Sequence, residues 1–326
     1  MGGYSLELCA GAGGQALGLE RAGFEHAGLV EIDPHACNTL RLNRPAWTVH
    51  EEDLNHFDGR LYKGVDLLAG GFPCPPFSIA GKQLGANDER DLFPAGLRIV
   101  DEVRPKAVMI VNVRGILSPD FEGYRSYIDQ RLKSMGYVTA WKLLNAADYG
   151  VSQLRPRVVI VALRKQYASE FSWPQPKRRA PTVGRLLHDL MGERGWRGAS
   201  EWREQADAIA PTVVGGSKKH GGPDLGPTRA RKAWAALGVD GIGIANEPPA
   251  EDFEGMPRLT VRMVARVQGF PDHWEFWGKK TASYRQVGNA FPPPVAYAVA
   301  SAISRAITSK GVRRRPQQRL WQAAMI

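Results

Sequence analysis

A cysteine held between prolines is the residue of this sequence best suited to nucleophilic chemistry. The stretch GGFPCPPFS ends an apolar run and places Cys74 between Pro73 and Pro75. Because proline cannot extend a helix or a sheet ladder, the chain must leave its strand here, with the thiol at the tip of a stiff loop. On residue type alone, an inert core cysteine is the commoner case, so other segments must decide between the two.

A glycine-rich turn near the N-terminus forms a second candidate site. LELCAGAGG reads as a strand followed by a turn at a helix N-terminus, where glycines let the backbone approach a ligand: Gly11, Gly13 and Gly14. Glu31 ends the next predicted strand, where a carboxylate suits the two hydroxyls of a ribose. Asp53, further along in HEEDLNHF, suits an adenine amino group. These residues predict a nucleoside cofactor, with nicotinamide, flavin and S-adenosylmethionine all open, and a turn without a ligand as the alternative.

The elements that would position these residues alternate in type along the first half of the chain. Strands are predicted at residues 4–10, 26–33, 65–71 and 106–113, and a helix follows each of them. Two more strands, at 138–146 and 155–164, have no helix between them. This pattern predicts an α/β fold with an open, doubly wound and mostly parallel sheet, and an antiparallel hairpin at one edge.

The pattern breaks near Trp173 and returns after a segment rich in Gly, Pro, Lys and Arg. We expect a first domain at 1–173, a second, smaller and irregular domain at 174–257, and a return to the first at 258–326. The returning segment contains a proline-started amphipathic helix at 292–307 and ends in a basic tail.

Composition limits the partners and the compartment. The 326 residues carry a formal net charge of +10, which suits nucleic acid. Only 3 cysteines occur, widely spaced, which argues against a disulfide framework and for a reducing cytoplasm. No Cys/His cluster has zinc spacing, so we expect no metal. Neither a signal peptide nor a run of about 20 apolar residues appears, so we expect no membrane partner.

Three segments, in this order, carry a family resemblance: PCPPFS, QLRPR and YRQVGNAFPPP. These sequences resemble those of the DNA (cytosine-5)-methyltransferases of the bacterial and phage restriction–modification type. The resemblance extends from residue 4 to about residue 305, apart from the irregular domain. The resemblance implies a Rossmann-like fold that uses S-adenosylmethionine and releases S-adenosylhomocysteine. It also implies methyl transfer to carbon 5 of a flipped-out cytosine in a short duplex sequence, with 174–257 as the target-recognition domain.

The resemblance implies covalent catalysis by Cys74, whose thiolate adds to carbon 6 of the cytosine and is released by elimination after methylation. Arg155 then corresponds to the residue that contacts the flipped base, and Arg157 to a residue that supports the site. Where the family has Glu-Asn-Val, this chain has Val111, Asn112 and Val113. Because valine cannot contact N3 or the exocyclic amine, we hypothesise slow methylation with DNA and cofactor binding retained. A changed base or reaction, or a DNA-binding protein with lost catalysis, is the alternative.

The resemblance also implies a cofactor site. Glu31 matches the ribose ligand, Asp53 the adenine ligand and Asn289 the contact to the methionine end, while Cys9 replaces a usual phenylalanine and reads, like Cys37, as a core residue. The full set is Leu8, Gly11, Gly13, Gly14, Glu31, Ile32, Asp53, Leu54, Pro73, Leu92 and Asn289.

Double-stranded DNA is the expected macromolecular partner. We expect the loop after Cys74 to contact it, and the irregular domain to read its sequence, through Ser78, Lys82, Arg90, Arg229 and Arg231. A monomer in the cytoplasm of a prokaryote, accompanied by a cognate restriction endonuclease, completes the expectation.

Overall fold

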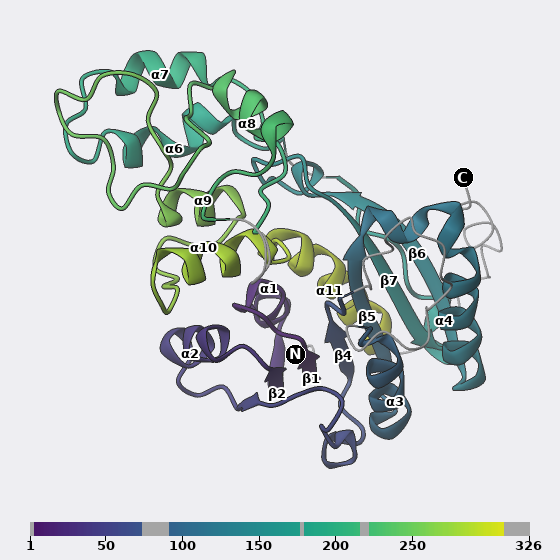
Figure 1. Ribbon diagram of the computed structural model, residues 1–326. Coiled ribbons are helices and arrows are strands. Elements are labelled where there is room, and N and C mark those ends of the chain that lie inside the picture. The colour runs from purple at the N-terminus through teal and green to yellow at the C-terminus, as the bar shows by residue number, and fades with distance from the viewer. Residues whose placement is uncertain (1–2, 74–90, 177–178, 216–221, 310–326) are drawn as a thin grey trace.

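The computed structural model describes residues 3–73, 91–176, 179–215 and 222–309. Figure 1 shows two lobes, one built on the sheet and a smaller one that contains α6, α7 and α8. Helices α9 and α10 lie between the smaller lobe and the sheet.

The sheet has seven strands in the order β3-β2-β1-β4-β5-β7-β6. Strands β1 to β5 pair in parallel, and β7 pairs antiparallel with both β5 and β6. The prediction of a doubly wound, mostly parallel sheet is therefore confirmed. The antiparallel pair also forms, but β7 inserts beside β5 and leaves β6 at the edge. The strands are β1 (Gly3–Leu8), β2 (Phe24–Glu31), β3 (Val49–Glu51), β4 (Leu67–Gly70), β5 (Ala107–Val113), β6 (Tyr137–Asn145) and β7 (Pro156–Arg164).

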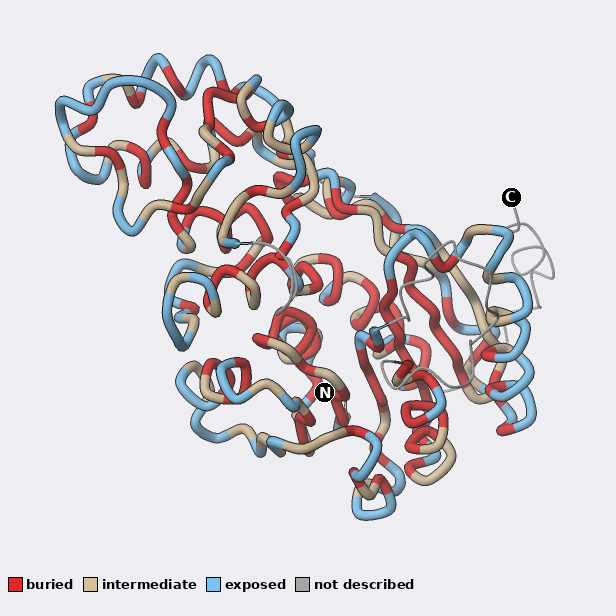
Figure 2. Tube along the Cα trace, in the orientation of Figure 1, coloured by how far each residue is buried: buried red, intermediate tan, exposed pale blue. Residues whose placement is uncertain are grey.

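Helices cover both faces of the sheet, so its central strands are buried on both sides (Figure 2). On one face Leu68, Val108 and Ile110 pack with α3 (Phe93–Val103) and α4 (Glu122–Ser134). On the other face Ala69 and Met109 pack with α11 (Pro293–Thr308). The remaining helices of this lobe are α1 (Gly14–Arg21), α2 (Pro34–Asn43) and α5 (Lys165–Ala168), with 3₁₀ turns at Gly59–Tyr62, Arg114–Leu117, Pro119–Phe121 and Ala146–Asp148.

Close packing of α11 against α1 sets the position of the glycine turn. A Cβ on Gly18 would lie 2.4 Å from the Cβ of Ala296 and 2.7 Å from the carbonyl oxygen of Pro293. Only a glycine lets the two helices approach so closely. The proline-started helix predicted near the C-terminus therefore forms, and it supports the helix that follows the glycine turn.

The smaller lobe contains α6 (Val183–Met191), α7 (Ala199–Gln205) and α8 (Thr228–Ala235) joined by long loops. Within the described part of 174–257, β-structure is limited to isolated bridges. Its core continues past residue 257 into α9 (Val261–Val267) and α10 (Lys280–Asn289), because Met263, Val264 and Val287 pack with Trp234. Packing thus joins α9 and α10 to this lobe, beyond the predicted boundary.

None of the helices in the described ranges is long and apolar enough to span a bilayer.

Candidate active site

A cavity of about 560 Å³ opens at the carboxyl ends of β1, β2, β4 and β5, where doubly wound sheets bind ligands. Helix α10 covers it with one face, because Ala282, Arg285, Gln286 and Asn289 recur at helical spacing. The other lining residues are Glu7, Cys9, Ala10, Gly11, Ala12, Gly14, Gln15, Glu31, Asp33, His35, Ala36, Gly71, Phe72, Pro73, Val111, Asn112, Val113, Arg157, Ala290 and Phe291.

The glycine turn forms the floor of the cavity. Gly11 (φ 54°) and Gly13 (φ 84°) both adopt left-handed conformations that favour glycine. No atom of the described residues lies within 4 Å of a Cβ built on Gly11, so this part of the chain leaves its backbone open to a ligand. A Cβ on Gly13 would instead lie 2.8 Å from Leu40 and 2.9 Å from Trp274. Gly13 is therefore required for packing against α2 and the segment before α10.

Glu31 joins the glycine turn to the end of β2. One carboxylate oxygen, Oε2, accepts a hydrogen bond from the backbone N–H of Gly11 at 2.7 Å. The other, Oε1, accepts from the backbone N–H groups of Ile32 at 2.9 Å and Asp33 at 2.8 Å. These bonds hold the carboxylate at the cavity wall, in the place predicted for a ribose ligand.

Two buried polar residues that the sequence interpretation missed lie behind the glycine turn. The side chains of Glu7 on β1 and Gln15 on α1 are 1% and 5% exposed, and both line the cavity. Glu7 Oε2 and Gln15 Nε2 have no hydrogen-bond partner within the described part of the chain. Burial raises the pKa of the Glu7 carboxyl well above its usual value, although the backbone of Ala16 opposes the shift. The sequence signal that could have revealed Glu7 is a carboxylate within an otherwise apolar strand.

The two described cysteines remain thiols. Burial raises the pKa of Cys9 far above its ordinary value, and the negative charge of Glu31 adds to the shift. Burial, again followed by Glu31, raises the pKa of Cys37 to about 12. Cys37 is a core residue as predicted, whereas Cys9 is half-buried, packs against the core under the sheet and also lines the cavity. Neither thiol is activated as a nucleophile.

Strand β5 ends at the cavity with Val111, Asn112 and Val113. Val111 is 6% exposed and shares one face of the sheet with Arg157, since Val113 pairs with Arg157 in register. The side chain of Asn112 points the other way: its Nδ2 donates to the carbonyl of Phe72 at 3.1 Å, and its Oδ1 accepts from the N–H of Val113 at 2.7 Å. Asn112 thereby holds the backbone that leads into Pro73 and Cys74.

The structure separates the roles of the two arginines in QLRPR. Arg157 lines the cavity, and burial lowers its pKa to about 10, so it remains cationic at neutral pH. Arg155 is 1% exposed and donates to the carbonyls of Val213, Gly288 and Ala290 instead. The expectation that Arg155 contacts the base is wrong for this conformation, because backbone carbonyls occupy its donors outside the cavity.

The remaining cofactor candidates divide into lining and supporting residues. Pro73 and Asn289 line the cavity, as do Gly11, Gly14 and Glu31. The side chains of Leu8 and Leu54 are buried in the core under the sheet, so neither reaches a ligand from there. Asp53 is not among the lining residues and accepts from the N–H of Asn55 at 2.9 Å, Leu92 packs at the start of α3, and Ile32 is 61% exposed.

The predicted nucleophile and its loop lie outside the described residues, namely Cys74, Ser78, Lys82 and Arg90. Of the two arginines predicted to contact DNA from the smaller lobe, Arg229 is exposed on α8. Arg231 is half-buried, and a Cβ on Gly241 would lie 3.1 Å from its Cγ. No cluster of His, Cys, Asp and Glu in the described ranges could hold a metal ion.

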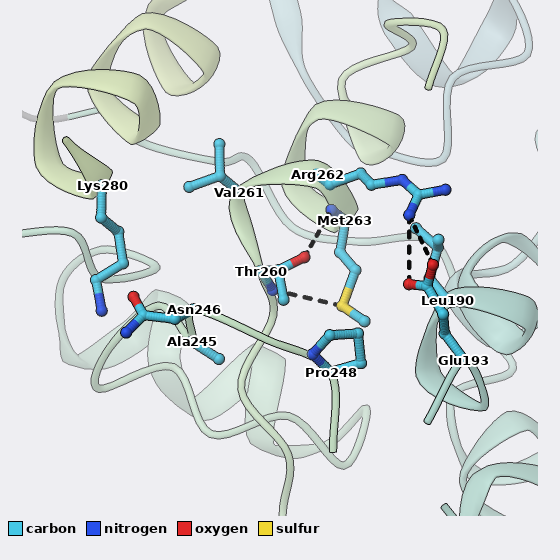
Figure 3. Close-up of a pocket in the computed structure, with 10 residues that line it drawn as sticks. All are labelled: Leu190, Glu193, Ala245, Asn246, Pro248, Thr260, Val261, Arg262, Met263 and Lys280. Carbon is cyan, nitrogen blue, oxygen red and sulfur yellow. Dashed lines mark hydrogen bonds and ion pairs between the residues drawn. The ribbon is translucent and has the colours of Figure 1, made fainter. Parts of the chain in front are cut away.

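A second cavity of about 320 Å³ lies between α6, α9 and the loop at 245–248 (Figure 3). Two of its three charged groups, Arg262 and Glu193, pair with each other at 3.0 Å, and the third is Lys280. Thr260 caps α9 through the N–H of Met263 at 3.2 Å, and the dashed lines of Figure 3 mark these contacts. Since this cavity does not lie at the carboxyl ends of the parallel strands, we place the active site at the cavity that does.

The sheet order and the glycine turn joined to Glu31 define a Rossmann-like, nucleoside-binding α/β protein. Residues 4–305 match the C-5 cytosine-specific DNA methylase family. The chain is 58% identical over 307 residues to the Type II methyltransferase M.NgoMIV of Neisseria gonorrhoeae, covering 93% of this chain and 97% of that protein. It is 55% identical over 312 residues to the Type II methyltransferase M.NaeI of Lentzea aerocolonigenes, covering 94% and 76%.

The fold also matches a prophage-encoded protein of Escherichia coli described as a DNA modification methyltransferase. The TM-score is 0.69 at 24% identity, over 94% of this chain and 99% of that one. The chain therefore belongs to the C-5 cytosine-specific DNA methylase family, and S-adenosylmethionine is its methyl donor.

Proposed function

We propose that this protein methylates carbon 5 of a flipped-out cytosine in a specific short sequence of duplex DNA, with Cys74 as the nucleophile. The observation that carries the proposal is the arrangement at the carboxyl ends of β4 and β5. There, Asn112 holds the carbonyl of Phe72, and the following Pro73 lines the cavity immediately before Cys74.

The cavity fits S-adenosylmethionine. Glu31 would bind the ribose hydroxyls, the open backbone at Gly11 would lie against the cofactor, and Asn289 would contact its methionine end. The buried, unpartnered Gln15 Nε2 and Glu7 Oε2 offer a donor and a further polar group behind the turn. When bound, the cofactor would supply an electrophilic methyl group for carbon 5 of the base.

Cys74 would carry the covalent step. Its thiolate would form a bond to carbon 6 of the cytosine, which makes carbon 5 nucleophilic. After methylation a base would remove the proton from carbon 5, the carbon–sulfur bond would break, and the thiolate would be regenerated. An ordinary thiol has a pKa of about 8.5, so a nearby positive charge favours the thiolate at neutral pH. Arg157 is the cation at the cavity wall that supports this role.

Val111, which stands where the family has glutamate, would lower the rate of methylation. It occupies the cavity wall beside Arg157 on the same face of the sheet, where it can neither accept a hydrogen bond from a cytosine amine nor donate to N3. A bound cytosine would therefore leave polar groups without a partner in a buried site. We propose that methylation is slow while cofactor and DNA binding are retained.

The smaller lobe would recognise the target sequence. Arg229 projects from α8, and the basic charge of the chain favours contact with the DNA backbone. Extraction of the base costs a few kcal/mol, which binding by both lobes would offset. We further propose that the protein acts as a monomer in the bacterial cytoplasm beside a cognate restriction endonuclease, as the class of its Type II relatives suggests.

The test uses the full chain, S-adenosylmethionine labelled in its methyl group, and unmethylated plasmid DNA. Label should appear in 5-methylcytosine within one short sequence. DNA with 5-fluorocytosine in that sequence should become covalently attached, because fluorine cannot leave as a proton. Cys74→Ser should abolish attachment, whereas Cys9→Ser and Cys37→Ser should retain it. Label in another base, or attachment that survives Cys74→Ser, would contradict the proposal.

A further inference from the structure

The smaller lobe meets the end of α10 backbone against backbone. A Cβ on Gly288 would lie 2.4 Å from Cα and 2.5 Å from N of Gly215. A Cβ on Gly215 would lie 2.6 Å from Oδ1 of Asn289 and 2.8 Å from the carbonyl oxygen of Arg285. Since Arg285 and Asn289 line the cavity, residues 213–215 pack directly on the outer side of its wall.

Arg155 joins the two sides of this contact. Its Nη1 donates to the carbonyl of Val213 at 2.7 Å, and its Nη2 donates to the carbonyls of Gly288 at 2.8 Å and Ala290 at 3.0 Å. One planar guanidinium thus grips the chain leading from the smaller lobe and both residues that flank Asn289. Lysine cannot reproduce this grip, because it donates from a single point.

Two buried glutamines complete the arrangement. Gln153 Oε1 accepts from the N–H of Val213 at 2.8 Å, and Gln153 Nε2 donates to Gln268 Oε1 at 2.6 Å. Gln268 in turn donates to the carbonyl of Val287 at 2.7 Å. Both glutamines are fully buried. We call Gln153, Arg155, residues 213–215, Gln268 and Gly288 the junction.

Burying the positive charge of Arg155 at the junction costs folding free energy. All four hydrogen bonds of its side chain go to neutral oxygens: besides the three backbone carbonyls, Nη1 donates to Gln153 Oε1 at 3.2 Å. Its Nε has no partner in the described part of the chain. Burial, and then the charge of Arg157, lowers its pKa well below the ordinary value. A buried cation held by carbonyls alone adds little to stability compared with an apolar side chain, so geometric specificity is the better explanation for it.

We propose that Arg155 is a positioning residue that fixes the smaller lobe against the wall of the active site. Through the junction, DNA held by the smaller lobe would be placed in one register relative to Asn289 and the cavity. This inference rests on the proposed function, and it replaces base contact as the role of Arg155. The consequence is that loosening the junction should impair methyl transfer within the bound complex more than it impairs DNA binding.

Two variants disturb the junction from opposite sides. Arg155→Lys removes the forked grip, and Gly288→Ala forces a methyl group into the backbone of Gly215. Arg164→Lys is the matched control for the first, because Arg164 at the other end of β7 also donates to two backbone carbonyls, of Pro105 at 3.2 Å and Met135 at 3.0 Å. Gly123→Ala on α4 is the control for the second, because no atom of the described residues lies within 4 Å of a Cβ there.

The measurements are the single-turnover methylation rate at saturating plasmid DNA and S-adenosylmethionine, the DNA Kd, and Tm. Both junction variants should methylate about 10²-fold more slowly per folded molecule, the effect of a displacement of about 1 Å, with DNA Kd near the wild-type value. Both controls should keep the wild-type rate. Amide hydrogen exchange at residues 210–215 should increase in the junction variants alone.

Two results would overturn the inference. One is a folded Arg155→Lys variant that methylates at the wild-type rate. This result is sufficient even if Gly288→Ala does not fold. The other is a loss that appears equally in Arg164→Lys and follows Tm, since that would reduce Arg155 to a general stabilising role. If the wild-type protein does not methylate the plasmid, the proposed function is contradicted. The hydrogen-exchange measurement then still tests whether Arg155 holds the junction together.

Discussion

The side-chain amide of Asn112 donates a hydrogen bond to the carbonyl of Phe72 across 3.1 Å, tying the end of β5 to the segment that leads into Cys74. The same side chain accepts from the N–H of Val113, so both of its polar ends are engaged. A residue predicted to take part in catalysis therefore acts on the backbone beside the nucleophile. This relationship has a direct experimental consequence.

Asn112→Leu should slow methylation with little change in cofactor binding. Leucine has a similar size but cannot hold the Phe72 carbonyl, so the chain before Cys74 loses its anchor and the nucleophile is displaced. We expect a loss of about 10²-fold in single-turnover rate, with the Kd for S-adenosylhomocysteine near wild type by calorimetry. Asn112→Asp is the comparison, because it retains the acceptor for Val113 and loses only the donor. An unchanged rate in both variants would show that the tie to Phe72 is dispensable.

Val111→Glu should accelerate methylation. The new carboxylate would lie on the face shared with Arg157, where a contact to N3 and the exocyclic amine of the base becomes available. Such an electrostatic contact is typically worth about 3–4 kcal/mol, or 10² to 10³ in rate. The measurement is methyl incorporation at saturating DNA, with DNA affinity expected to change much less. Val113→Glu, two residues further along the same face, is the control that should not gain activity. Ordinary activity in the present chain, with no gain from Val111→Glu, would mean that another group fulfils this role.

Arg229→Gln should weaken DNA binding without lowering Tm. Arg229 is exposed on α8, so its removal should reduce the slope of log Kd against log salt by about one if it binds phosphate. Arg231→Gln, whose stem packs against Gly241, should lower Tm instead. A base-reading arginine elsewhere in 174–257 should relax discrimination by about 1–3 kcal/mol when replaced. If substitutions across the whole segment change only overall affinity, recognition of the target lies elsewhere.

His26 should make stability depend on pH. Its Nε2 lies 3.0 Å from the carbonyl of Ala16, so Nε2 carries the proton and Nδ1 accepts from Ser5 Oγ at 3.0 Å. Burial lowers the pKa of His26 from 6.5 to about 4, so the unfolded chain binds more protons between these values. The stabilisation is complete above pH 6.5 and should be lost as the pH falls toward 4, by on the order of 3 kcal/mol. Between pH 6.5 and 4, the free energy of unfolding measured in urea should fall more steeply with decreasing pH in the wild type than in His26→Gln. Equal pH dependence in the two proteins would exclude this effect.

Local pattern was sufficient for most of the fold. Apolar runs separated by amphipathic segments predict the parallel strands, because a strand covered on both faces must be apolar along its length. The glycine turn and the acidic end of β2 were likewise readable, since a turn that meets a ligand requires glycine at particular positions. The insertion of β7 beside β5 was not readable, because strand order depends on pairing between segments far apart in sequence.

The sequence by itself determined the family, the cofactor and the α/β class, since these depend on short motifs whose order along the chain is visible. Only the tertiary structure decided which way each side chain of those motifs points. Arg155 and Arg157 are two residues apart, yet one grips backbone carbonyls at the junction and the other lines the cavity. Glu7, inconspicuous in its strand, becomes a buried carboxyl beside Gln15. The reason is physical: a motif specifies residue types, whereas burial, partners and pKa arise from contacts between segments that meet only in the folded chain.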